Sequence, residues 1–118
     1  MISAIQHIHL SSAGNLREHW RTRAKRAKEQ RLMGRLMASG SMRLFFLQSE
    51  GLLIIRFVRV APRPLDDDNC AFAFKAVRDG VADAFGVSDN HPRIHWEYAQ
   101  ERGKPSQIRI ECEIREGR

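Results

Sequence analysis

Residues 52–60 read LLIIRFVRV, and residues 68–85 read DNCAFAFKAVRDGVADAF. The first segment is apolar almost throughout, which is typical of a β-strand covered on both faces. In the second, apolar side chains recur at helical spacing, at positions 70, 73, 74, 77, 81, 84 and 85, so one stripe of a helix is expected to be buried. A buried strand followed by such a helix predicts a domain in which helices pack on a sheet.

Towards the N-terminus, residues 4–10 alternate in the manner of a short strand, with Ile8 and Leu10 on one side. Residues 16–37 then predict a long basic helix that Gly34 weakens near its end. We expect Trp20 to lie in the core rather than to serve as a base-stacking platform. Residues 42–47 form a short apolar piece whose type the pattern does not decide. The apolar side of the predicted helix consists of Leu16, Trp20, Ala24 and Ala27.

Towards the C-terminus, residues 94–98 and 107–114 alternate apolar and polar side chains and predict two strands. The turn at Gly103, Lys104 and Pro105 predicts that these strands form a hairpin. The whole order is strand, helix, strand, helix, strand, strand. It predicts an α+β fold with a mixed sheet and two main helices, in a single domain that spans residues 1–118.

The composition fits a globular domain, with 42% hydrophobic and 29% charged residues. No apolar run approaches the roughly 20 residues that a membrane-spanning helix needs, so we expect a cytoplasmic protein. The two cysteines, Cys70 and Cys112, fall on the apolar faces of predicted elements. We expect them to be reduced thiols that pack as small hydrophobic groups.

The positive charge is concentrated in one segment. The net charge is +6, and residues 17–43 alone hold nine basic side chains against two acidic ones. Such a block indicates a polyanionic partner, either a nucleic acid or an anionic membrane surface. We assign phosphate contacts to six of these side chains, with an ordinary solvated helix face as the alternative. They are Arg17, Arg21, Lys25, Lys28, Arg31 and Arg35.

Three consecutive carboxylates stand between the buried strand and the second helix, at Asp66, Asp67 and Asp68. Adjacent anions repel, so such a cluster is favourable where a cation neutralises it or water solvates it. In an extended segment Asp66 and Asp68 would point the same way and Asp67 away from them. Carboxylates in this arrangement suit Mg²⁺ or Mn²⁺. The alternative is that Asp66 or Asp67 caps the helix and the others face water, whereas the spacing of an EF-hand loop is absent.

These residues resemble the RusA-type Holliday junction resolvases of bacteria and their phages. The family pattern is a strand, then Asp-x-Asp-Asn at the start of a helix, a lysine followed by alanine and by aspartate three residues on, and an acidic residue in the turn after the helix. Here it reads Asp66 to Asn69, then Lys75 to Asp79, then Asp89. The lysine stands one helical turn later than in the family, and Ser88 occupies a place that is often acidic there.

The resemblance implies an endonuclease that depends on Mg²⁺, with Mn²⁺ as the alternative metal. It also implies a homodimer that resolves four-way junctions in double-stranded DNA. Asp66, Asp68 and Asp89 would coordinate the metal, and Lys75 would stabilise the scissile phosphate or the leaving oxygen. We interpret Asp79 as a surface acid paired with Lys75, and His91 and His95 as side chains outside the metal site. A non-catalytic nucleic-acid-binding protein with the same fold is the alternative function, and an interaction module with a structural acidic loop is a third.

Overall fold

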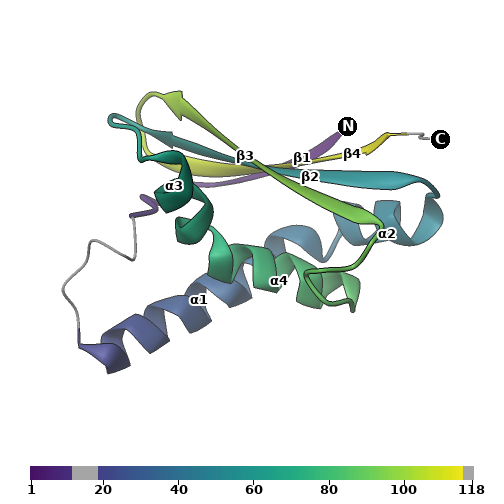
Figure 1. Cartoon of the computed structure of the whole chain (residues 1–118), viewed down its shortest axis with the longest axis horizontal. Helices are drawn as coiled ribbons and strands as arrows, with labels where there is room; N and C mark the ends of the chain where they lie inside the picture. Colours follow the sequence, from purple (N-terminus) through teal and green to yellow (C-terminus); the bar gives the residue numbers. More distant parts are fainter. Residues whose placement is uncertain (12–18, 116–118) are drawn as a thin grey trace.

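The computed structural model describes residues 1–11 and 19–115. A four-stranded sheet forms one layer, and the helices lie below it (Figure 1). The structure therefore confirms the predicted α+β class with a mixed sheet. None of the described helices is both long and apolar enough to cross a membrane. In chain order the elements are β1 (Ile2–Gln6), α1 (Trp20–Ala38), α2 (Ser41–Gln48), β2 (Leu52–Ala61), α3 (Asp67–Ala73), α4 (Lys75–Phe85), β3 (Ile94–Arg102) and β4 (Gln107–Arg115).

The strand order is β1-β4-β2-β3, with β2 parallel to β3 and antiparallel to β4. Strand β2 thus has a neighbouring strand on both sides, and its side chains are buried at nearly every position, in agreement with its near-continuous apolar sequence. The predicted hairpin between the last two strands is wrong, because β2 lies between them. The connecting turn crosses the end of β2, where the Gly103 amide donates to the Ala61 carbonyl at 3.1 Å. Alternation predicts strands but does not say which strands are neighbours.

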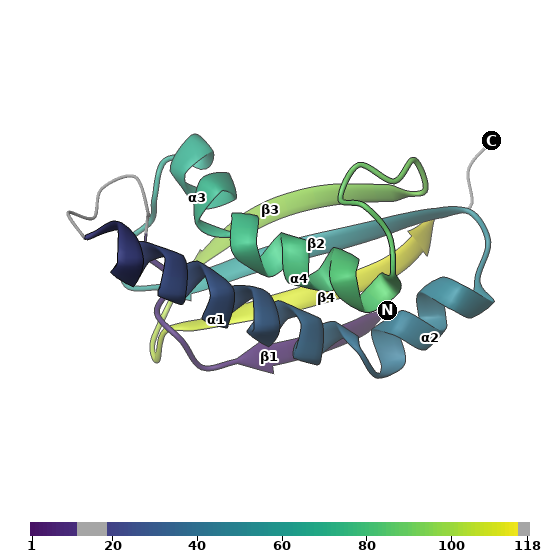
Figure 2. The same cartoon turned by 90° about the horizontal axis from the view of Figure 1, so that it is seen from below.

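Helix α1 is buried along a different side from the predicted one. It packs beside α4 through its C-terminal half, where Gly34 and Ala38 are buried and Met33 and Met37 half-buried (Figure 2). The prediction that Trp20 lies in the core is wrong, since 64% of its surface is exposed. Ala24 and Ala27 are also exposed, and Leu16 lies outside the described residues. In the described part of the chain, the apolar residues in the N-terminal half of α1 are exposed, so they do not define the buried face.

Two glycines allow α1 and α4 to approach each other closely. A Cβ atom on Gly34 would lie 2.3 Å from the Val77 carbonyl oxygen, and one on Gly80 would lie 1.9 Å from the Arg31 carbonyl oxygen. No side chain fits at either place. Gly34, which the sequence suggested as a weak point of its helix, is therefore a point of backbone contact between two helices.

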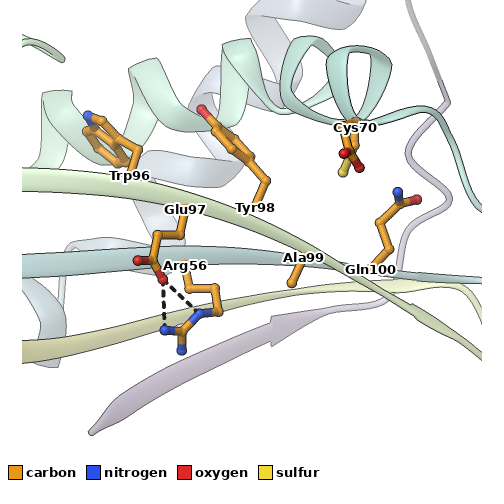
Figure 3. A pocket seen from close by; sticks show the side chains of 8 residues that line it. Arg56, Cys70, Trp96, Glu97, Tyr98, Ala99 and Gln100 are labelled. Atoms are coloured by element: carbon orange, nitrogen blue, oxygen red, sulfur yellow. Dashed lines mark hydrogen bonds and ion pairs between the residues drawn. The ribbon is translucent and has the colours of Figure 1, made fainter.

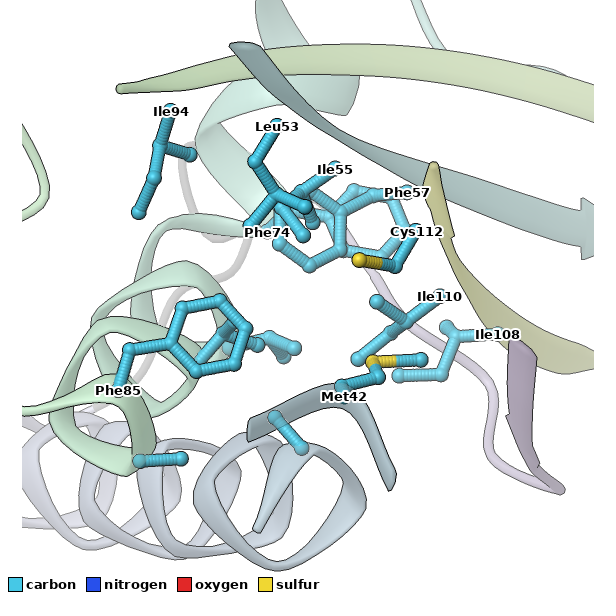
Figure 4. Packing of buried hydrophobic residues seen from close by; sticks show 14 of the residues in the cluster. Met42, Leu53, Ile55, Phe57, Phe74, Phe85, Ile94, Ile108, Ile110 and Cys112 are labelled. Atoms are coloured by element: carbon cyan, nitrogen blue, oxygen red, sulfur yellow. The ribbon is translucent and has the colours of Figure 1, made fainter. Parts of the chain in front are cut away.

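The second predicted helix is divided at Phe74 into α3 and α4. The Phe74 ring is fully buried and stacks on Phe57 at 5.1 Å between ring centroids. All seven residues of the predicted apolar stripe are buried, as the helical spacing indicated. They contribute to one core with the inner face of the sheet (Figure 4). Gly86 ends α4 in the left-handed conformation, with φ of 72°, which confirms the predicted helix end.

The apolar piece whose type the sequence left open is helix α2, with Met42 and Phe46 buried. Both cysteines are buried free thiols, as expected. Burial raises the pKa of the Cys112 thiol to about 12, so this side chain stays protonated and packs as an apolar group.

Candidate functional site at the start of helix α3 and the turn after α4

The acidic segment lies at the N-terminus of α3. Asp66 occupies the N-cap position but its side chain makes no capping hydrogen bond, and Asp67 and Asp68 lie in the first turn. All three side chains are exposed. Within the described ranges, none of the three carboxylates makes a hydrogen bond or ion pair. The Asp66 side chain therefore does not act as a helix cap, and the oxygens remain available to an external ligand.

The backbone before these carboxylates is held from two sides. The side-chain amide of Gln100 on β3 accepts from the Leu65 N–H at 2.8 Å and donates to the Leu65 carbonyl at 2.7 Å. The buried Arg59 guanidinium donates to the carbonyls of Leu10 and Arg63 at 2.7 and 2.9 Å. These contacts fix the backbone of Arg63 and Leu65, which precede Asp66, although the carboxylates themselves are free.

A cavity of about 450 Å³ lies between α3 and β3, next to the acidic segment (Figure 3). Asp67 lines it together with Cys70, Tyr98 and Gln100, whereas Asp66 and Asp68 do not. The sequence argument treated this segment as extended and placed Asp67 apart from the site. The helix already begins at Asp67, so alternation along a strand does not apply there.

The turn after α4 carries Asp89 in a second cluster. Its carboxylate lies 3.6 Å from the Lys75 ammonium and 3.5 Å from Arg78 Nε. Lys75 also pairs with Asp79 at 2.8 Å, as the sequence predicted. The hydrogen bond from Lys75 to Asp79, with the charges of Asp79 and Asp89, raises the lysine pKa above its usual value. Lys75 is therefore a fixed positive charge at neutral pH.

Arg78 attaches this turn to strand β3. Its guanidinium donates to the Tyr98 hydroxyl at 3.0 Å and to the Asp89 carbonyl at 3.3 Å, and it lies over the Trp96 ring at 4.9 Å. Trp96 Nε1 donates to the same Asp89 carbonyl at 2.7 Å. Arg78 therefore lies at the centre of this cluster, one helical turn after Lys75.

The acidic segment and Asp89 are attached to opposite halves of strand β3. Asp66 follows the residue that Gln100 binds, and Asp89 is bound by Trp96, four residues earlier on the strand. Four residues of strand correspond to about 13 Å. Among residues 1–11 and 19–115, no three Asp, Glu, His or Cys side chains lie close enough together to hold a metal ion. Asp66, Asp68 and Asp89 all belong to these ranges, so a single chain does not gather them into one group.

The free carboxylate oxygens at Asp66 to Asp68 are hard donors, and Mg²⁺ in proteins is often held by one or two carboxylates with water and substrate phosphate. That segment therefore fits the ion in its chemistry. Asp89 fits only if its ion pairs with Lys75 and Arg78 open.

The basic helix borders the same region. A cleft of about 220 Å³ between α1 and the α3–α4 unit is lined by Arg23, Arg26, Lys75 and Asp79 among others. The sequence analysis did not select Arg23 or Arg26, because the side of α1 that faces α3 depends on the helix packing. The cleft places two arginines of α1 around the same space as Lys75.

The predicted phosphate-binding side chains differ in their surroundings. Arg31 makes a bidentate ion pair with Asp83 on α4, at 2.6 and 2.9 Å, and this pairing lowers the pKa of Asp83. Arg21 lies over the ring of Trp20 at 5.2 Å. Arg17 falls outside the described residues. The remaining three predicted side chains are exposed, namely Lys25, Lys28 and Arg35.

The two histidines near Asp89 have other neighbours. His91 packs edge-on against Phe46, with ring centroids 5.9 Å apart. His95 lies 3.6 Å from Glu97 on the opposite face of the sheet. Neither belongs to a group of three or more candidate metal ligands among the described residues.

Comparison with known proteins gives one relative, described as "Uncharacterized protein", from Xylella fastidiosa (strain Temecula1 / ATCC 700964). It is 37% identical over 87 residues, which cover 68% of this chain. The match covers 57% of the relative, so this chain spans less than two thirds of that protein's length. No protein-family model matches the chain, and no solved structure matches it.

Proposed function

We propose that this protein is a Mg²⁺-dependent endonuclease that cuts branched double-stranded DNA, such as four-way junctions, as RusA-type resolvases do. The observation that carries the proposal is the position of free carboxylates at Asp66 to Asp68 on the same α3–α4 unit that bounds the arginine-lined cleft. Phosphodiester hydrolysis needs hard anionic ligands for a divalent ion next to cations that bind phosphate. The α3–α4 unit carries the carboxylates and Lys75, and α1 contributes Arg23 and Arg26 from the other side of the cleft.

Asp66, Asp68 and Asp89 are the residues that would hold the metal. When bound, Mg²⁺ lowers the pKa of a water molecule and neutralises charge on the reacting phosphate. Lys75, kept protonated by Asp79, provides a positive charge to the non-bridging or leaving oxygen of the scissile phosphate. In this role Lys75 exchanges its ion pair with Asp89 for one with the substrate, and the Asp89 carboxylate becomes a metal ligand when its ion pair with Arg78 opens as well.

The arginines and lysines of α1 hold the DNA backbone. Arg23 and Arg26 bind the phosphates nearest the cleft, while Lys25, Lys28 and Arg35 bind phosphates farther along the exposed helix. Arg31 mainly fixes α1 to α4 through Asp83. Binding through such contacts weakens steeply with salt concentration.

A non-catalytic DNA-binding protein is the second candidate. The ion pairs of Asp89 with Lys75 and Arg78 favour it, because they occupy a carboxylate and a cation that cleavage requires. In that case α1 still binds DNA phosphates, but the carboxylates remain solvated and no bond is cut.

The test uses a labelled four-way junction incubated with the purified protein, with and without Mg²⁺. The endonuclease gives metal-dependent nicks, and Asp68→Asn abolishes them while junction binding remains or tightens, since a repelling charge is removed. Glu50→Gln, a neutralisation at an exposed turn away from the site, is the matched control and should cut normally. Binding without any product under all metal conditions supports the second candidate. Cleavage that persists in Asp68→Asn excludes this residue from the mechanism.

A further inference from the structure

An aromatic side chain lies exposed in the cleft between α1 and the α3–α4 unit. Phe72 lines this cleft, and 55% of its surface is accessible to solvent. It is absent from the hydrophobic core of the described residues, to which Phe74 and Phe85 of the same unit contribute. A large apolar side chain that is left exposed inside a cleft indicates a binding site. The surrounding side chains indicate what binds there.

The cleft combines small apolar side chains with positive charge. Three basic side chains line it against a single acidic one, Asp79, which pairs with Lys75 at 2.8 Å. The other two basic side chains are Arg23 and Arg26. A ligand of this cleft therefore joins a negatively charged part to an apolar part that packs on Phe72. The remaining apolar residues of the lining are Ala27, Ala73 and Ala76.

A nucleotide has a charged part and an apolar part within one unit of its chain. Each base has a flat face that stacks on an aromatic ring, and each phosphate binds arginine and lysine. Pockets for drug-sized ligands measure roughly 300 to 1,000 Å³. The cleft, at about 220 Å³, therefore takes a single base and not a base pair. Neighbouring bases cover both faces of a base within a duplex, so the base that binds is an unpaired one.

The length of the positive surface favours DNA over an acidic peptide. A short acidic peptide with one apolar side chain would also supply a charged and an apolar part. The exposed basic side chains, however, continue along α1 from Arg23 as far as Arg35, which is twelve residues or about 18 Å. A polyanion with regularly repeated charges matches such a row better than a short peptide does.

Phe72 also lies close to one of the proposed metal ligands. Asp68 precedes it by four residues in α3, so the two side chains lie on the same side of this helix, about 6 Å apart along its axis. Successive bases of a stacked strand are about 3.4 Å apart. A base that stacks on Phe72 therefore belongs to a nucleotide within about two positions of a phosphate held near Asp68.

We propose that the cleft around Phe72 binds one unpaired base of DNA, stacked on the Phe72 ring, while Arg23 and Lys75 hold the phosphates beside that base. The closeness of this base to the phosphate that is cut rests on the proposed function, whereas the binding of the base does not. The cleft selects branched or otherwise distorted DNA over a continuous duplex, because an unpaired base reaches Phe72 without the cost of unpairing and unstacking.

Binding to a bulged duplex without metal tests the base site. One labelled probe carries a single unpaired adenine, and the other carries an abasic residue at the same place, which keeps the phosphates but lacks the base. In EDTA, the wild type should bind the adenine probe about 5- to 150-fold more tightly than the abasic probe. Phe72→Ala should lose this preference, because it should bind both probes as the wild type binds the abasic one.

Three further variants separate stacking from general apolar contact. Phe72→Tyr keeps the ring and should keep the preference for the adenine probe. Phe72→Leu keeps an apolar side chain without a ring and should lose most of it. Leu44→Ala is the matched control, since it removes a side chain of similar exposure, 51%, that lies outside the cleft. If Phe72→Ala prefers the adenine probe as strongly as the wild type does, the base site is refuted and an acidic peptide becomes the better ligand for the cleft.

Salt dependence tests the phosphate contact independently of the base. Arg23→Gln should weaken binding to both probes by the same factor and should reduce the slope of log affinity against log salt concentration by about 1. Phe72→Ala should leave that slope unchanged, since stacking releases no counterion. An unchanged slope in Arg23→Gln would remove this arginine from the phosphate contacts.

Cleavage of a four-way junction with Mg²⁺ decides the part that rests on the proposed function. An abasic residue should slow cutting only where it lies within about two nucleotides of the cut phosphate, and equal effects at all distances would contradict this placement. A wild type that binds the two bulged probes equally refutes the base site, while metal-dependent junction cleavage still decides the proposed function. A wild type that binds neither probe at low salt refutes the base site and the proposed function together.

Discussion

Gly80→Ala should lower the stability of this protein although alanine is the better helix residue. The added Cβ atom would lie 1.9 Å from the Arg31 carbonyl oxygen, where an ordinary contact needs 3.4 Å or more. Helices α1 and α4 would therefore have to separate by roughly 1.5 Å. Overpacking of this kind costs about 3 kcal/mol, and the gain in helix propensity returns about 1 kcal/mol. The expected net loss is about 2 kcal/mol, or roughly 8 °C in the unfolding midpoint of a chain of this length.

The assay is thermal unfolding followed by circular dichroism, with urea unfolding to obtain the free energy. Gly40→Ala is the matched control, since nothing lies within 4 Å of a Cβ atom there and its φ is negative. The control should stay within about 0.5 kcal/mol of wild type. A Gly80→Ala variant that unfolds at or above the wild-type midpoint would refute the role of this glycine in the helix contact.

Three further predictions concern charged and buried groups. Asp83→Asn should lower the free energy of unfolding at pH 7 by less than about 1 kcal/mol, because the ion pair between Asp83 and Arg31 is partly exposed. The ion pair lowers the pKa of the Asp83 carboxyl, so it stabilises the fold above the ordinary pKa range of aspartate. In urea unfolding, the difference between the variant and the wild type should therefore vanish as the pH falls through the lowered pKa. Arg59→Met should lower the free energy of unfolding by about 2 kcal/mol, since the carbonyls of Leu10 and Arg63 lose a charged donor. An unchanged free energy in chemical unfolding would contradict this. The Cys112 thiol should resist alkylating reagents at pH 8 until urea unfolds the chain, because its pKa is raised to about 12, and mass spectrometry would detect modification.

The parts of the fold that local patterns determine were predictable. The apolar stripe from Cys70 to Phe85 repeats with the helical period, and Gly86 marks the helix end, so the buried face and the end of α4 follow from sequence alone. The run of apolar residues in β2 likewise predicts a buried strand, and nearly all of its residues are buried. These features depend on residues close together in the chain.

The parts that depend on distant partners were not predictable. Trp20 looked apolar enough for the core, but it is exposed at the first position of α1. Two alternating segments before and after Gly103 looked like a hairpin, yet β2 pairs with both. Only the packing of α1 on α4 shows that Gly34 is a contact.

In the candidate site, too, local features were predictable and features that depend on distant partners were not. Composition and spacing identified the acidic segment and the pairing of Lys75 with Asp79. They did not indicate that Asp67 lines the cavity, because the boundary of the helix had to be known to within one residue. They also did not indicate that Arg78 binds the turn of Asp89, which requires the parallel placement of β3 beside β2.

The division of the second helix at Phe74 has a mechanical consequence for the lysine that stands one turn later than in the RusA family. Lys75 is the first residue of a new helix, so its direction relative to Asp68 is set by the torsion angles of one residue, φ of −88° and ψ of 0°, and not by the pitch of a continuous helix. The Phe74 side chain anchors this residue in the core, where its ring stacks on Phe57. Substitutions that repack the core around Phe74 would therefore change the distance between the acidic segment and Lys75. No surface residue of the acidic segment or of α4 would have to change.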